Sequence, residues 1–181
     1  KRSGKPESLE VLANVTEESI IDDIEGAAAH APFVIVDLEG TASITVAYAI
    51  SRADLVIIPS QGSQLDASEA AKAIKLIRQQ EKAFTRKIPY AVLFTRTSAA
   101  IRPRTLQHIR AEFEKHSVSV FQTQMHEREA FRAIFSFGGT VESLNGSQVS
   151  NLDAAVKNAR AFASEVVTML RQDAAPKAEV A

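Results

Sequence analysis

The sequence contains no cysteine. This absence excludes disulfides, thiolate-bound metals, iron–sulfur clusters and thiol catalysis, and it is typical of a reducing compartment. Neither sign of charge dominates, since 21 Lys and Arg stand against 22 Asp and Glu, for a formal net charge of −1. The chain as a whole therefore has no strong attraction to nucleic acid or membranes, and any basic surface must be local.

Long hydrophobic runs are also missing. No apolar stretch approaches the ~20 residues that a membrane-spanning helix needs, and no secretory signal opens the sequence. Residues 175–181 lack the pattern of basic and bulky apolar side chains that marks an amphipathic membrane anchor. We therefore expect no membrane partner and a cytoplasmic location.

The composition that is present is that of an ordinary globular protein. The 181 residues are 45% hydrophobic and 24% charged, which suffices for one compact domain with a sizeable core. We predict a single α/β domain over residues 1–172 and a frayed polar tail over residues 173–181. The sequence starts at Lys1 and not at Met, and we expect it to be part of a longer chain.

Helical signals recur along the sequence. Thr16 is a candidate N-cap followed by two acids, which the helix dipole favours there. Asp66 and Glu69 have the spacing of a capping box, and Pro103 suits the first turn of a helix. Helices are therefore predicted after each of these caps, and also over residues 44–50 and 152–170.

Apolar runs between these helices read as β-strands. The predicted strands cover residues 9–15, 33–38, 54–59, 88–95 and 117–121. Uninterrupted apolar runs suit parallel strands that are buried on both faces. Strands alternating with helices predict an α/β fold with a doubly wound, mostly parallel sheet flanked by helices. Ligands bind such sheets at the carboxyl ends of the strands, here residues 37–40, 59–64 and 95–102.

The stretch VIVDLEGTAS, residues 34–43, ends a predicted strand on Asp37. One interpretation is a turn residue whose carboxylate accepts bonds from local backbone amides. The other is a carboxylate that orients a magnesium-bound water beside nucleotide phosphates, which requires a glycine-rich phosphate loop with Lys and Ser or Thr. No such loop is present, because the Gly-Lys pair at residues 4–5 precedes a proline and residues 138–140 lack lysine. The residues alone leave both interpretations open.

Two longer segments carry a family resemblance. Residues 33–74, FVIVDLEGTASITVAYAISRADLVIIPSQGSQLDASEAAKAI, resemble the middle of ParA/MinD-type ATPases, which have a deviant phosphate loop. In that run residues 53–59 match the family block A-D-x-V-I-I-P. Residues 127–141, EREAFRAIFSFGGTV, resemble the later segment R-E-A … S-F-G-K-P-V. The likeness spans about residues 9–170, and DLEGTAS resembles the branch that includes the VirC-type accessory protein of DNA transfer.

The resemblance implies a P-loop NTPase-like fold that lacks its first strand, phosphate loop, helix and second strand. The intact protein is then expected to bind ATP and Mg²⁺, to dimerise on ATP binding and to hydrolyse ATP, whereas these 181 residues alone are expected to bind ATP poorly. By position, Asp37 corresponds to the carboxylate that holds the water shell of the magnesium ion. Glu39, Gly40 and Thr41 fall in the switch that senses the γ-phosphate.

Departures from the family pattern affect the other implied roles. Glu39 stands where relatives have prolines, and it is either a group that positions the attacking water or a solvated turn acid. Thr95 and Arg96 end the strand that reaches the adenine base in relatives, where Asn is commoner than Thr. Residues 122–124 fall in the base-contact loop but lack its proline.

Basic residues concentrate around the third strand end. The resemblance implies nonspecific DNA binding, for which we name Arg102, Arg104 and Arg110 as phosphate contacts; the alternative is a solvated surface. No aromatic residues interleave with these arginines, so base stacking is not indicated. The four histidines have no metal-ligand spacing.

Two function classes follow from these observations. The first is an ATPase of plasmid partition or of conjugal or T-DNA transfer, with DNA, a second copy of itself and a partition or transfer protein as partners. The second is a non-enzymatic adaptor that keeps the fold and binds DNA or a partner.

Overall fold

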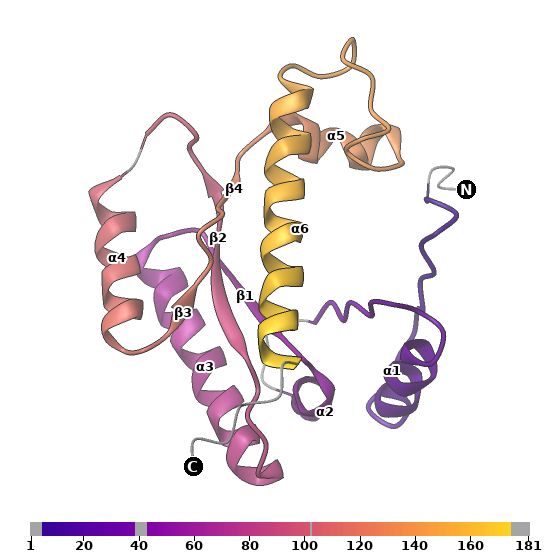
Figure 1. Cartoon of the computed structure of the whole chain (residues 1–181), viewed down its shortest axis with the longest axis vertical. Coiled ribbons are helices and arrows are strands. Elements are labelled where there is room, and N and C mark those ends of the chain that lie inside the picture. Colours follow the sequence, from indigo (N-terminus) through magenta and orange to yellow (C-terminus); the bar gives the residue numbers. More distant parts are fainter. Residues whose placement is uncertain (1–4, 39–42, 102, 175–181) are drawn as a thin grey trace.

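The computed structural model describes residues 5–38, 43–101 and 103–174. Helices and strands alternate as the sequence predicts between residues 44 and 120, but no strand lies among the described residues before residue 44 (Figure 1). The helices are α1 (Ile20–Ala28), α2 (Ile44–Arg52), α3 (Gln64–Phe84), α4 (Arg104–Lys115), α5 (Glu129–Phe137) and α6 (Leu152–Ala174). The strands are β1 (Val56–Ser60), β2 (Tyr90–Thr97), β3 (Ser119–Val120) and β4 (Met125–His126).

The sheet is built around β2, and every pairing in it is parallel. β1 pairs with one edge of β2 in the register Val56 to Tyr90 through Ser60 to Phe94. β3 and β4 both pair with β2, β3 near its start and β4 near its end. The predicted α/β fold with a parallel sheet flanked by helices is therefore confirmed.

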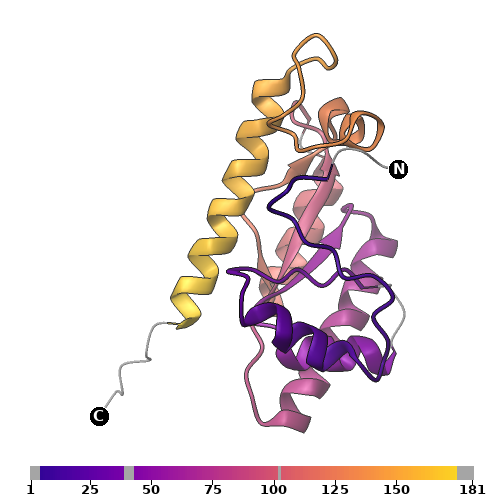
Figure 2. The same ribbon diagram turned by 90° about the vertical axis from the view of Figure 1, so that its right-hand side faces the viewer.

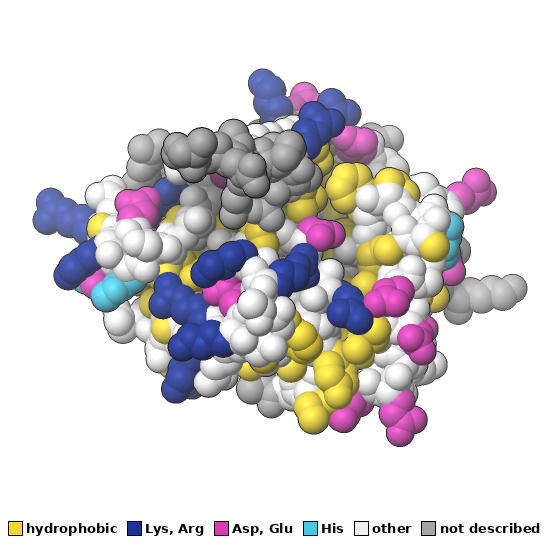
Figure 3. All heavy atoms as spheres, turned by 60° about the horizontal axis from the view of Figure 1, so that its bottom comes forward, with side chains coloured by type: hydrophobic (Ala, Val, Ile, Leu, Met, Phe, Trp, Pro, Cys, Tyr) yellow, Lys and Arg dark blue, Asp and Glu magenta, His cyan; other side chains and the backbone are white. Residues whose placement is uncertain are grey.

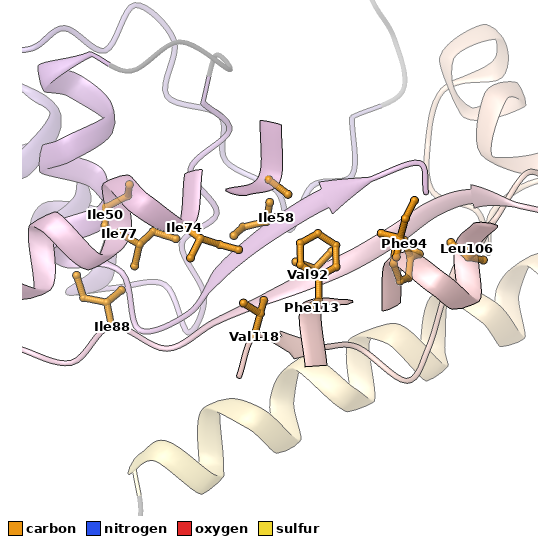
Figure 4. Close-up of a cluster of buried hydrophobic side chains, with 12 residues drawn as sticks. Ile50, Ile58, Ile74, Ile77, Ile88, Val92, Phe94, Leu106, Phe113 and Val118 are labelled. Atoms are coloured by element: carbon orange, nitrogen blue, oxygen red, sulfur yellow. The ribbon is translucent and has the colours of Figure 1, made fainter. Parts of the chain in front are cut away.

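Alternate residues of β2 enter two different cores. Val92 and Phe94 point toward α3 and α4, where they join a cluster that includes Ile74 and Phe113 (Figure 4). Ala91 and Leu93 belong to a second cluster, against which side chains of α6 pack. Because helices cover both faces, the strand carries apolar residues without interruption.

A third apolar cluster joins α5 to α6. It is formed by Ala130, Ala133, Leu144, Val149 and Ala155, all of which are less than 9% exposed. Figures 1 and 2 show α6 running alongside the sheet, with α5 near its N-terminal end. α5 and β4 were not among the predicted elements. β4 has only two residues, and α5 has no side chain that caps its N-terminus.

Two predicted strands are wrong. Residues 9–15 and 33–38 form no strand in the described structure, and their apolar side chains are exposed, with Ile35 at 89% and Val11 at 63%. An apolar run becomes a strand only where a neighbour completes its hydrogen bonds, and among the described residues neither run has one. Figure 1 shows this N-terminal segment to one side of the sheet, beyond β1.

Several element ends also differ from the prediction. α1 begins after Ser19 and not after Thr16, although the two exchange hydrogen bonds. The N-cap of α3 is Ser63, whose hydroxyl accepts a hydrogen bond from the backbone N–H of Asp66 at 3.1 Å. The capping residue therefore lies three residues before Asp66, the predicted one. α6 runs to Ala174, so the first two residues of the predicted tail are helical, and residues 175–181 lie outside the described residues.

Within the described ranges, no helix is long and apolar enough to cross a membrane.

Candidate functional site at the carboxyl edge of the sheet

The carboxyl ends of β1, β2 and β4 bring polar side chains to one edge of the sheet. The Thr95 hydroxyl of β2 donates to the Ser60 carbonyl of β1 at 3.5 Å. Two residues further along β2, the Thr97 hydroxyl lies 2.9 Å from His126 Nδ1 of β4. This is the edge at which parallel sheets bind ligands, and the sequence placed Thr95 there correctly.

The loop after β1 passes close to α4. Gly62 has φ +78°, a conformation that favours glycine. A Cβ at this position would lie only 2.4 Å from Leu106 Cδ1. The chain therefore turns through Gly62 directly against α4 before Ser63 caps α3.

Arg96 forms a bulge between β2 and β4. Thr95 pairs with Met125 and Thr97 pairs with His126, so Arg96 is the extra residue of β2. It has φ +51° and is exposed. Bulges re-aim neighbouring side chains, and this one brings Thr97 to His126. The adenine contact predicted for Arg96 stays a prediction.

The predicted base-contact loop is held by α6. Glu165 accepts the backbone N–H groups of Gln122 at 2.7 Å and Thr123 at 2.8 Å. Asn158 accepts the N–H of His126 at 3.0 Å and donates to the Gln124 carbonyl at 2.7 Å. Two side chains of α6 thus fix a loop that lacks the family's proline.

Sequence reasoning missed Glu165 and Asn158. Both lie on a helix whose apolar stripe was its only visible signal, and their partners are 32 to 43 residues away in the chain. The sequence does not indicate which polar residues beside an apolar stripe will bond to a distant loop.

The pKa of His126, on β4 at this edge, departs clearly from the ordinary value of a histidine. Burial lowers the pKa of His126 below 6.5, and the positive charge of Arg128 lowers it further. A hydrogen bond with the backbone of Thr97 acts in the opposite direction. The neutral imidazole is therefore favoured at this edge.

The predicted switch is only partly visible. Asp37 is exposed and follows the extended run of residues 33–36. Glu39, Gly40 and Thr41 lie outside the described residues. No hydrogen bond or ion pair of Asp37 is found within the described ranges. The roles of Asp37 and of the three switch residues stay predictions.

The described residues do not by themselves fit ATP with Mg²⁺. No group of three or more His, Asp or Glu side chains among them is placed to hold a metal ion. The sequence also lacks a lysine-bearing phosphate loop. Asp37 alone supplies one carboxylate, whereas Mg²⁺ at a nucleotide site is bound by carboxylates together with phosphates and waters.

The three arginines named for DNA differ in their surroundings. Arg104 is exposed at the first residue of α4, and Arg102 lies outside the described residues. Arg110 is largely buried, with its side chain 22% exposed, and pairs with Glu114 at 3.3 Å. Its guanidinium also donates to the Phe121 carbonyl and lies 5.9 Å from the centre of the Phe94 ring. Arg110 therefore ties α4 to the end of β3.

Comparison with known proteins places the whole chain among relatives. The family model described as VirC1 protein matches residues 10–173. The chain is also 41% identical over 167 residues to Protein ParA of Rhizobium radiobacter, an alignment that covers 92% of this chain and 75% of that protein.

Proposed function

We propose, from the premise that the chain belongs to the VirC1 protein family, that it has a ParA-like role in plasmid partition or in conjugal or T-DNA transfer. The observation that carries this proposal is the match of the family model to residues 10–173, together with the 41% identity to a protein named ParA. The parallel sheet with helices on both faces agrees with that assignment.

The finer part of the proposal is an ATP-dependent dimer switch. In it, Asp37 holds the water shell of Mg²⁺, and Glu39, Gly40 and Thr41 respond to the γ-phosphate. Thr95 and Arg96 lie toward the base. Hydrolysis then releases the dimer from DNA or from a partition or transfer partner. Its support is the position of residues 37–41 in a segment that resembles the family, and of Thr95 and Arg96 near the carboxyl end of β2.

We assign the phosphate loop to a segment outside these 181 residues. The apolar side chains of Val34, Ile35 and Val36 are exposed, and among the described residues the outer edge of β1 has no partner strand. A further strand would cover exposed apolar side chains and pair with an open sheet edge. Residues 1–172 are then one domain without its first strand, loop, helix and second strand.

The test is magnesium-dependent ATP binding by the protein joined to that unit. Asp37→Asn is expected to weaken ATP binding in the presence of Mg²⁺ at least about tenfold, because the carboxylate charge proposed to hold the magnesium-bound waters is lost. The matched control is Asp54→Asn, whose carboxylate is 86% exposed and pairs only with Arg86 at 3.4 Å. The 181 residues alone are expected to bind ATP poorly, and tight magnesium-dependent binding by them would contradict the assignment.

A second candidate is a non-enzymatic adaptor that retains the fold. It is favoured by the departures from the family pattern, namely Glu39 where relatives have prolines and the missing proline in residues 122–124. DNA-stimulated ATP turnover by the longer protein separates the two. Turnover that Asp37→Asn abolishes supports the ATPase, and no turnover with intact DNA binding supports the adaptor.

A further inference from the structure

Basic side chains gather along the C-terminal half of α3. Lys75, Arg78 and Lys82 recur at about one helical turn and are exposed, and exposed Lys87 follows in the loop before β2. We refer to these four residues as the α3 basic strip. Figure 3, which brings the lower end of Figure 1 forward, shows Lys and Arg side chains gathered on one face.

The strip borders two hollows in the surface. One, of about 810 Å³, lies between α3 and α4, and the other, of about 550 Å³, lies at the end of α3. Arg78 and Lys82 line both. Two of the four residues of the strip therefore lie between these hollows.

Protein carboxylates do not neutralise most of the strip. None of the ion pairs within the described ranges involves Lys75, Arg78 or Lys82. Lys87 lies 3.8 Å from Glu81, but that side chain is 15% exposed and accepts the backbone N–H of Ile88 at 3.1 Å.

Other arginines near the strip already have structural partners. Arg86 donates to the carbonyls of Ser51 and Ala53, both at 2.9 Å, and so ties the end of α2 to the loop after α3. Arg110 is held by Glu114 and the Phe121 carbonyl. Lys75, Arg78 and Lys82 differ because they are exposed and have no carboxylate partner within the described ranges.

The helix dipole does not account for the strip. Cations are stabilised in the last turn of a helix, and the effect fades within that turn. Lys82 lies there, but Lys75 and Arg78 lie further from the end of α3. Lys72, the next cation toward the N-terminus, is paired with Glu69 at 2.7 Å.

We propose that the α3 basic strip binds the phosphate backbone of DNA without regard to sequence. This inference rests on the proposed function for the identity of the polymer. Lys75 and Lys82 are two turns apart, about 10.5 Å along α3, which matches about three phosphates of one DNA strand. In this proposal the strip contacts phosphates in addition to Arg104. Arg110 is not counted among these contacts, because its guanidinium is bound to Glu114 and the Phe121 carbonyl.

A protein partner fits the strip less well. The centre of a protein interface needs accessible apolar or aromatic side chains, but Ile74 and Ile77 of the same helix are 5% and 0% exposed. No exposed Phe or Tyr lines either hollow. Long cations without apolar anchors give contacts to phosphates and no base readout.

The experiment measures binding of the protein to a labelled 30-base-pair duplex of arbitrary sequence by fluorescence anisotropy, over a series of KCl concentrations. K75Q/R78Q/K82Q removes three proposed phosphate contacts. The slope of log affinity against log salt should then fall by about 2.7, at 0.9 per contact, and the affinity at low salt should fall at least about tenfold. K75Q/K82Q, which keeps the bond of Arg78 to Tyr90, should lower the slope by about 1.8.

The matched control is K157Q/R160Q/R171Q, which removes three exposed cations from α6 and should leave the slope close to that of the wild type. Thermal unfolding followed by circular dichroism confirms that each variant is folded. An unchanged slope in both α3 variants would overturn the inference, and so would a wild type without salt-dependent binding. Displacement of the DNA by polyglutamate at equal charge would do the same, since it would identify a surface for acidic proteins.

Magnesium-dependent ATP binding separates this inference from the proposed function when it is measured on the same variants, and on the wild type, joined to the unit that carries the phosphate loop. Loss of DNA binding with ATP binding intact is the result expected from the strip. If ATP binding is absent from the wild type while the strip still governs DNA binding, the ATPase proposal fails and the inference stands.

Discussion

Residues 33–38 and β2 are both apolar runs in an α/β chain, yet they have opposite fates. Phe94 of β2 is 0% exposed, whereas Ile35 is 89% exposed. The difference lies outside the runs. β2 has parallel neighbours at both edges and helices on both faces, whereas residues 33–38 have no strand partner among the described residues. A hydrophobic pattern therefore specifies a strand only in combination with its neighbours.

Residues 122–124 stand between these extremes. Like residues 33–38, they belong to no strand. Their backbone groups nevertheless form hydrogen bonds with the side chains of Glu165 and Asn158 of α6. Side chains from a distant helix have replaced the hydrogen bonds that a neighbouring strand would supply. A connecting segment can thus be positioned at the sheet edge without joining the sheet.

The largest difference in stability is expected when one side chain in each apolar run is shortened to alanine. Phe94→Ala should lower the free energy of unfolding by about 3–5 kcal/mol, because it leaves a cavity against Phe113 and removes the ring beneath Arg110. Ile35→Ala, at an exposed position, should change it by less than about 0.5 kcal/mol. Urea unfolding measures both. A cost for Ile35→Ala comparable with that of Phe94→Ala would show that residues 33–38 are buried in solution.

A smaller effect is expected where α6 holds the loop. Glu165→Ala leaves the N–H groups of Gln122 and Thr123 without their acceptor and should cost about 1–3 kcal/mol. Glu142→Ala is the control, since its exposed carboxylate pairs only with Arg160 of α6 and should contribute at most about 1 kcal/mol. Equal losses of stability in urea unfolding would mean that the loop does not depend on α6.

The smallest effect concerns His126. Its pKa in the folded protein lies below 6.5, so between that pKa and 6.5 the unfolded chain binds more protons than the folded one. Stability should therefore be complete above pH 6.5 and fall as the pH drops through this window. His126→Gln should flatten this dependence, while His108→Gln on the exposed face of α4 should retain it. Urea unfolding between pH 5 and 8 compares the three proteins.

Much of the architecture follows from local patterns. The alternation of helix and strand between residues 44 and 120, the doubly covered β2 and the placement of Thr95 at the carboxyl edge were all correct, because periodicity and caps act within a few residues. The same reasoning placed the start of α3 at Asp66, whereas Ser63 is the cap. Ser and Asp both serve as caps, so a second candidate one turn away shifts the boundary.

The candidate site depended more on contacts between distant residues. Arg102, Arg104 and Arg110 are alike in sequence, yet Arg110 is bound to Glu114 and the Phe121 carbonyl while Arg104 is exposed. Conversely, no pattern in the sequence singled out Lys75, Arg78 and Lys82. Their common exposure without carboxylate partners became visible only with the neighbouring elements in place.

The sequence by itself determined the class of fold, the order of most elements and the resemblance to the family, because these depend on residue types at short spacings. The tertiary structure decided which apolar runs have strand partners, which basic side chains remain accessible and which polar residues of α6 hold the loop at residues 122–124. The physical reason is that hydrogen-bond pairing and burial depend on groups that lie tens of residues apart in the chain.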